Sequence, residues 1–183
     1  MSFIAVDIEG NGGTPPAIVE LAATRVDPTT GLGEARSWLV KPPAPIQWRA
    51  KKIHGISNES VRSCPPIREI EGEIVTFLGN EIAVAHNASV DLGIMRKELL
   101  SWRPAGFIDT LTLARKLVPG RPSYKLYDLV NFYSLTDPAE KQEIHRAQGD
   151  AIACAKLFLK LVELARDRSL QPSALVTRLT YVE

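Results

Sequence analysis

The chain opens with three short apolar segments in quick succession, and their spacing limits the folds available to it. Phe3–Ile8 is apolar at nearly every position and stops at a glycine-rich stretch, as expected of a buried strand. The segments Ala17–Val26 and Ser37–Val40 follow, each closed by residues that include proline. Strands joined by such short connections pair most simply as an antiparallel meander.

The pattern changes after Pro65-Pro66, where apolar residues begin to recur at helical spacing. Helices are predicted over residues 67–78, 90–100, 109–117, 126–132 and 147–165, and short strands over 82–85 and 107–108. The order β-β-β-α-β-α-β-α-α-α predicts an α/β fold, with a mixed five-stranded sheet flanked by helices.

Length and composition are those of one globular domain. The 183 residues can enclose a well-buried core, and 45% of them are hydrophobic. No apolar run approaches the roughly 20 residues of a membrane helix, and no basic leader precedes the first strand, so we expect a cytoplasmic protein with no membrane partner. Cys64 and Cys154 form no metal-type or redox-type pair and are expected to be free thiols.

The net charge of +1 argues against a domain that grips nucleic acid through bulk electrostatics, but not against an enzyme that holds only a strand end. Basic residues do gather in two groups, whose simplest interpretation is solvated surface. One group is Arg49, Lys51 and Lys52, and the other is Arg115, Lys116, Arg121 and Lys125.

Four carboxylates and one histidine carry the strongest chemical signal. Asp7 and Glu9 stand two apart in the first strand, so their side chains share one face and repel each other unless a cation lies between them. Asp91 and Asp150 each begin a predicted helix, where a capping role is the simpler interpretation of either residue alone. His145 lies five residues before Asp150, and imidazole suits proton transfer near neutrality. Together they predict a site that holds divalent cations and moves a proton beside them.

Four sequence blocks resemble the DEDDh subgroup of the DnaQ-like 3′→5′ exonucleases. They are Val6-Asp7-Ile8-Glu9, Ile53-His54-Gly55-Ile56, the run from Ala85 to Asp91, and the run from His145 to Asp150. The similarity extends from about Phe3 to Leu164, with the blocks in the family order. It implies a ribonuclease-H-like sheet, with an exonuclease domain over residues 1–168 and a C-terminal tail or short helix over 169–183.

The resemblance also implies an activity: release of nucleoside 5′-monophosphates from the 3′ end of single-stranded DNA or RNA by two-metal hydrolysis. The implied ligands of two divalent cations, Mg²⁺ or Mn²⁺, are Asp7, Glu9, Asp91 and Asp150. The implied general base is His145. Hard oxygen ligands without cysteine suit these ions. The residues that the resemblance places near the terminal nucleotide are Gly10, Asn11, His54 and Asn87.

Two positions depart from the family pattern. Gly10-Asn11-Gly12 replaces the usual Thr-Thr-Gly in the loop that contacts the terminal nucleotide, and Val90 replaces an aromatic residue just before Asp91. The sequence therefore leaves the choice between DNA and RNA open. One alternative is an exoribonuclease that acts on short RNA. Another is a non-catalytic relative that binds strand ends or a polymerase, and a polymerase or repair partner is also open for the enzyme.

Several residues near these blocks also have structural interpretations, which are the simpler ones for Glu20, Tyr124 and Lys125. His54 is as readily a packing or turn residue, and His86 can satisfy a backbone group at a strand end. Glu20 is most simply a partner in a structural salt bridge. Tyr124 and Lys125 are either exposed surface or contacts to phosphate or base.

Overall fold

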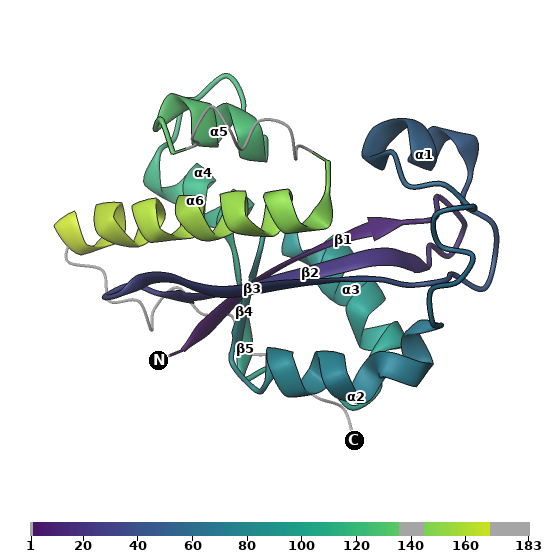
Figure 1. Ribbon diagram of the computed structural model, residues 1–183. Helices are drawn as coiled ribbons and strands as arrows, with labels where there is room; N and C mark the ends of the chain where they lie inside the picture. Colours follow the sequence, from purple (N-terminus) through teal and green to yellow (C-terminus); the bar gives the residue numbers. More distant parts are fainter. Residues whose placement is uncertain (1, 136–144, 169–183) are drawn as a thin grey trace.

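The computed structural model describes residues 2–135 and 145–168, in which helices cover both faces of one sheet (Figure 1). The predicted C-terminal tail or short helix, 169–183, lies outside the described residues. No helix in the described part of the chain is both long and apolar enough to span a membrane.

The sheet has five strands in the order β3-β2-β1-β4-β5 (Figure 1). β1 (Phe3–Gly10), β2 (Ile18–Asp27) and β3 (Gly31–Leu39) form the antiparallel meander that the sequence predicts. β4 (Ile82–Ala85) pairs parallel to β1, and β5 (Gly106–Asp109) pairs parallel to β4. The predicted fold class, a mixed five-stranded sheet of ribonuclease-H-like type flanked by helices, is confirmed.

Six helices are described, and five of them are divided between the two faces of the sheet. One face carries the fourth, fifth and sixth helices, and the opposite face carries the second and third (Figure 1). Their bounds are α1 Trp48–His54, α2 Ile67–Leu78, α3 Ala88–Glu98, α4 Thr110–Leu117, α5 Leu126–Phe132 and α6 Ala147–Asp167.

Successive residues of β1 face opposite sides of the sheet, as the two-residue period of a strand requires. Phe3 and Ala5 pack into the apolar cluster beneath α6, whereas Ile4, Val6 and Ile8 pack into the cluster beneath α2 and α3. The strand is therefore buried on both sides, which explains why its sequence is apolar almost throughout.

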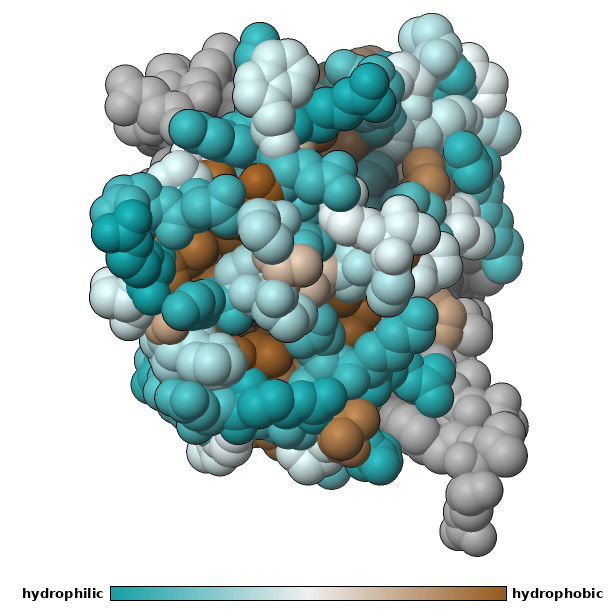
Figure 2. Space-filling model, turned by 90° about the vertical axis from the view of Figure 1, so that its right-hand side faces the viewer, coloured by the Kyte–Doolittle hydropathy of each residue, from teal (hydrophilic) through white to brown (hydrophobic). Residues whose placement is uncertain are grey.

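Two segments differ from the prediction. β3 begins at Gly31 rather than at Ser37. The prediction missed its first half because β3 is an edge strand, and its mostly exposed residues show no apolar alternation. α1 was not predicted, since only Ala50 and His54 of its seven residues are buried and no apolar stripe forms. Viewed from the right-hand side of Figure 1, the surface is mainly hydrophilic, and apolar side chains show as separate patches (Figure 2).

Candidate active site

Three of the predicted carboxylates meet near the C-terminal end of β1, the central strand of the sheet. Asp7, Glu9 and Asp150 each present an oxygen, and these oxygens lie within 4.8 Å of one another. Asp7 and Glu9 continue the series of β1 side chains that faces α6, and Asp150 stands in the first turn of α6. We call this group the carboxylate cluster. Residues more than 140 positions apart in sequence are therefore brought together as predicted.

Burial and mutual repulsion raise the pKa values of all three groups. Burial raises the pKa of Asp7 well above its usual range, and the charges of Asp91, Asp150 and Glu9 raise it further. Burial, followed by the charge of Asp150, raises the pKa of Glu9 to about 8. Burial also raises the pKa of Asp150. The negative charges are thus poorly compensated by the protein itself, and a bound cation would stabilise their ionised forms.

Asp91 lies outside the 4.8 Å group but acts on it. Its side chain is buried in the first turn of α3, and its carboxylate accepts a hydrogen bond from the Ile8 backbone amide. Burial and the charges of Asp109 and Asp150 raise its pKa to about 7. Its charge is the largest of those that raise the pKa of Asp7. The fourth predicted carboxylate therefore borders the cluster from the β4 side.

His145 lies at the entrance to α6, beside Asp150. Its backbone N–H donates to Asp150 Oδ1 at 3.3 Å, and its side chain is exposed. Its φ is 63°, in the left-handed region that favours glycine but admits histidine more readily than most residues. The predicted proximity of His145 to Asp150 is found.

Tyr127 is a site residue that the sequence analysis missed. Its hydroxyl donates to Asp150 Oδ1, and its ring lies 6.5 Å, centroid to centroid, from the His145 ring. Two donors from different segments thus fix the same carboxylate oxygen. The only sequence signal was a tyrosine inside a short apolar helix, which does not specify a partner 23 positions away.

Glu20 and Arg146 hold the start of α6 against β2. The Glu20 side chain is 2% exposed, and it accepts hydrogen bonds from Arg146 Nε at 3.0 Å, Arg146 Nη2 at 2.6 Å and the Ala147 backbone amide at 3.0 Å. The predicted role of Glu20 as a structural salt-bridge partner is confirmed. In the sequence, Arg146 lies between His145 and the helical turn that carries Asp150.

The loop after β1 is organised by the buried side chain of Asn11. Its Oδ1 accepts hydrogen bonds from the Gly13 and Ala17 backbone amides, both at 3.0 Å, and its Nδ2 donates to the Ala44 carbonyl at 3.3 Å. Gly12 adopts a φ of 76°, and a β-carbon there would lie 3.1 Å from Ala50 Cβ. Since the Asn11 amide is used inside the protein, the loop can meet a nucleotide through its backbone rather than through this side chain.

His54 fixes the same loop from α1. It is buried, its Nδ1 accepts the Ile56 N–H at 3.0 Å, and its Nε2 lies 3.2 Å from the Gly10 carbonyl oxygen. Because Nδ1 accepts, Nε2 must carry the proton and donate to Gly10. Burial lowers the pKa of His54, which favours this neutral form. The geometry gives His54 a role in positioning the predicted nucleotide loop.

Asn87 and His86 follow β4 on the other side of the cluster. Asn87 is exposed, has a φ of 66° and precedes α3, so its side chain is available to a ligand. His86 is occupied instead: Nε2 donates to the Tyr124 carbonyl and Nδ1 contacts Thr110 Oγ1, both at 2.9 Å. His86 does satisfy a backbone group, but that group is the Tyr124 carbonyl in the segment before α5 rather than one at a strand end.

Comparison with known proteins identifies the family. Residues 4–158 match the family model described as Exonuclease, of RNase T type. DNA polymerase III subunit epsilon of Aquifex aeolicus is 32% identical over 88% of this chain and 81% of its own length. The 3′-5′ exonuclease DinG of Bacillus subtilis is 30% identical over 90% of this chain, but the match covers only 18% of DinG. Other relatives are also much longer, with 12% to 25% of their length covered.

Solved structures agree with the sequence relatives. Exonuclease X in complex with 5′ overhanging duplex DNA is 29% identical, with a TM-score of 0.74 over 94% of this chain and 96% of that one. Exonuclease I of E. coli in complex with a dT13 oligonucleotide shares the fold at 18% identity, with a TM-score of 0.75. The predicted resemblance and the predicted enzyme class are both confirmed: the chain belongs to the exonuclease family.

Proposed function

We propose that this exonuclease domain removes nucleotides stepwise from the 3′ end of single-stranded DNA, with two divalent cations at the carboxylate cluster. The observation that carries the proposal is the convergence of Asp7, Glu9 and Asp150, with His145 at the edge of the cluster. The relative named as a 3′-5′ exonuclease supports the direction of digestion. The neighbours solved with DNA support a DNA substrate.

The donor set fits hard divalent cations. The cluster consists of carboxylate oxygens that repel one another, and the neighbouring Tyr127 donor stabilises only Asp150. Asp7, Glu9 and Asp150 would hold the ions, with Asp91 contributing from α3, and oxygen ligands of this kind suit Mg²⁺ or Mn²⁺. When bound, such ions neutralise the carboxylates, polarise the scissile phosphate and lower the pKa of a coordinated water.

The remaining residues of the site position the substrate and move a proton. His145 is exposed beside Asp150, where its ring can accept a proton from the attacking water. Tyr127 holds the Asp150 carboxylate in place. The backbone of Gly10 and Asn11 borders the cluster at the end of β1, where the terminal nucleotide would lie.

The test is digestion of a 5′-fluorescent single strand. Wild-type protein with Mg²⁺ or Mn²⁺ should give a ladder of products that shorten one nucleotide at a time, and EDTA should stop the reaction. Asp7→Asn should reduce the rate by at least about 10³-fold, since the ions contribute several kcal/mol of transition-state stabilisation. Glu59→Gln is the matched control, because Glu59 is an exposed carboxylate far from the cluster.

The same assay decides between the proposal and its alternatives. Faster digestion of a matched RNA strand would favour the exoribonuclease. Tight binding of the strand by folded protein, without cleavage in either metal, would favour the non-catalytic relative and refute the proposal. Labelled products that end in a 3′-phosphate would contradict the proposed cleavage, because release of a nucleoside 5′-monophosphate leaves a 3′-hydroxyl on the shortened strand.

A further inference from the structure

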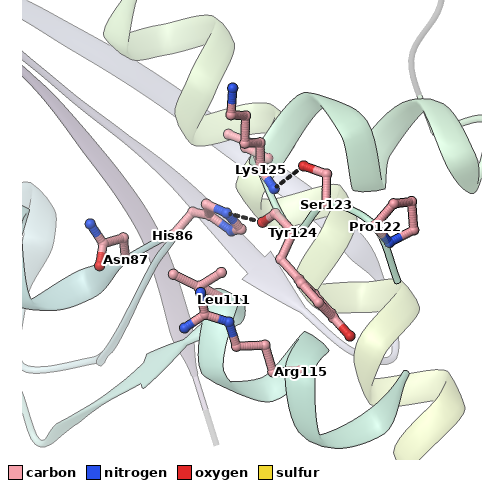
Figure 3. A pocket seen from close by; sticks show the side chains of 9 residues that line it. His86, Asn87, Leu111, Arg115, Pro122, Ser123, Tyr124 and Lys125 are labelled. Atoms are coloured by element: carbon pink, nitrogen blue, oxygen red, sulfur yellow. Dashed lines mark hydrogen bonds between the residues drawn. The ribbon is translucent and has the colours of Figure 1, made fainter. Parts of the chain in front are cut away.

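A basic hollow lies near the carboxylate cluster and has no part in the proposed reaction. It is a hollow of 680 Å³ bordered by Asn87, Arg115, Ser123, Tyr124 and Lys125, between the end of β4 and the segment that leads into α5 (Figure 3). We call it the α4–α5 hollow. It contains residues from the second basic group of the sequence, which the proposed reaction leaves without a role.

The α4–α5 hollow adjoins the site at two points. Asn87 immediately precedes α3, which carries Asp91 in its first turn. At the other side, Leu126 lines the hollow and is followed by Tyr127, whose hydroxyl binds Asp150. Asp109 adds a spatial link, because its carboxylate accepts the Asn87 N–H and its charge acts on Asp91. The hollow therefore lies beside residues that border the cluster.

The charge of the hollow is positive. Arg115 and Lys125 are its cations, and no carboxylate is among the described residues that line it. Asp109 and Asp128 are nearby counter-charges. The Asp109 carboxylate is bonded to the Asn87 and Leu111 backbone amides and to Thr112 Oγ1, and Asp128 Oδ2 accepts from Ser123 Oγ. Both His86 nitrogens are engaged, and burial lowers the pKa of His86, so it stays neutral.

The wall that carries Lys125 is fixed before any ligand arrives. The Tyr124 hydroxyl donates to the Val118 carbonyl at 2.8 Å and accepts the Arg121 N–H at 3.2 Å. The Tyr124 carbonyl accepts from His86 at 2.9 Å, a bond visible in Figure 3. The Arg115 guanidinium lies 5.8 Å from the centre of the Tyr124 ring. A preformed wall lowers the entropic cost of binding.

We propose that the α4–α5 hollow binds the backbone phosphate of the strand on the 5′ side of the scissile bond, through Arg115 and Lys125. The inference rests on the proposed function. It adds that strands of several nucleotides bind better than a mononucleotide ester, because only a strand reaches the hollow. Phosphate recognition by paired cations explains how a chain of net charge +1 can hold a strand locally.

The test compares a strand with a substrate too small to reach the hollow. The double variant carries Arg115→Gln and Lys125→Gln. Its control is Lys116→Gln, which removes an exposed cation of α4 that does not line the hollow. Binding of fluorescent dT8 is followed by anisotropy in Ca²⁺ over a range of salt concentrations, with a gel to show that the strand stays intact. Hydrolysis of thymidine 5′-monophosphate p-nitrophenyl ester is followed in Mn²⁺.

The double variant should bind dT8 at least about tenfold more weakly, because hydrogen bonds to charged groups are among the stronger ones. The slope of log affinity against log salt should fall by about 0.7, since the two cations neutralise one phosphate and each neutralised phosphate on a single strand contributes about 0.7. The double variant should hydrolyse the p-nitrophenyl ester at the wild-type rate. Lys116→Gln should change neither the dT8 affinity nor its salt slope.

Unchanged dT8 affinity and salt slope in the folded double variant would overturn the inference, and so would an equal loss on the small ester. A wild-type protein that binds dT8 but cleaves neither substrate would refute the proposed function. The binding measurement in Ca²⁺ would still decide whether Arg115 and Lys125 contact the strand.

Discussion

Glu20 on β2 and Arg146 at the start of α6 form a two-pronged ion pair, with Arg146 Nε and Nη2 at 3.0 and 2.6 Å from the two Glu20 oxygens. The same carboxylate accepts the Ala147 backbone amide. This pair joins the central part of the sheet to the segment between His145 and Asp150. It therefore connects the rigid β-sheet to the part of the site that comes from the far end of the chain.

Glu20→Gln should destabilise the protein and lower turnover together. The amide cannot accept both guanidinium bonds, so we expect a loss of about 1–3 kcal/mol in the free energy of unfolding. We also expect kcat to fall more than KM rises, because the substitution loosens His145 and Asp150 rather than the nucleotide loop. Urea unfolding and steady-state kinetics measure the two effects. Glu59→Gln breaks an exposed pair with Arg62 and should change stability by less than about 1 kcal/mol; equal effects in both variants would contradict the argument.

Tyr127→Phe isolates the donor that holds Asp150 from α5. Without the hydroxyl, the Asp150 carboxylate loses a hydrogen bond that stabilises its ionised form. We expect about tenfold more Mn²⁺ to be needed for half-maximal activity. Tyr133→Phe is the matched control, because the Tyr133 hydroxyl is buried and has no hydrogen-bond partner among the described residues. A similar Mn²⁺ requirement in both variants would show that Tyr127 acts only through packing.

Patterns of short period predicted most of the fold. The two-residue period of β1 placed Asp7 and Glu9 on one face, and the helical period after residue 147 placed Asp150 in the first turn of α6. The helix predicted over 109–117 is found as α4, and the Asp109 side chain caps it by accepting the Leu111 N–H. Each of these features depends on residues that are close together in the sequence, and so the sequence alone is enough to predict it.

Contacts between distant segments could not be predicted in the same way. Asn11 was expected to face a nucleotide, yet its side chain binds Ala44, 33 positions away, and organises its own loop. The bond from Tyr127 to Asp150 likewise depends on how α5 packs on α6. Neither amide nor hydroxyl groups carry a periodic signal, so their partners become known only when the packing of the elements is known.

His145→Ala tests the proton-transfer role. General-base catalysis contributes about 10²–10⁴ in rate, and turnover should fall by that factor. Mn²⁺ affinity should stay close to wild type, because the hydrogen bond from His145 to Asp150 comes from its backbone amide, which alanine retains. Added imidazole should restore part of the lost rate. A matching loss of Mn²⁺ affinity, measured by calorimetry, would show that His145 supports the metal site instead.

The stability of the metal-free protein should fall as the pH rises. The pKa of Glu9 is raised from 4.5 to about 8, and that of Asp91 from 3.8 to about 7, mainly by burial. Between the lower and the upper values the folded protein binds more protons than the unfolded chain. The slope of the unfolding free energy with pH is proportional to the protons bound by the unfolded state minus those bound by the folded state. The slope is therefore negative in this pH window.

Thermal unfolding in EDTA, from about pH 5 to about pH 9, measures this slope. Glu9→Gln should flatten it and raise the metal-free Tm near the upper end, while Glu59→Gln should leave it unchanged, since Glu59 is exposed. Mn²⁺ should raise the Tm more at high pH than at low pH, because the ion binds the ionised carboxylates and stabilises only the folded state. A Tm in EDTA that is constant, or that rises as Glu9 and Asp91 ionise, would mean that their repulsion is relieved within the protein and that the cluster needs no cation.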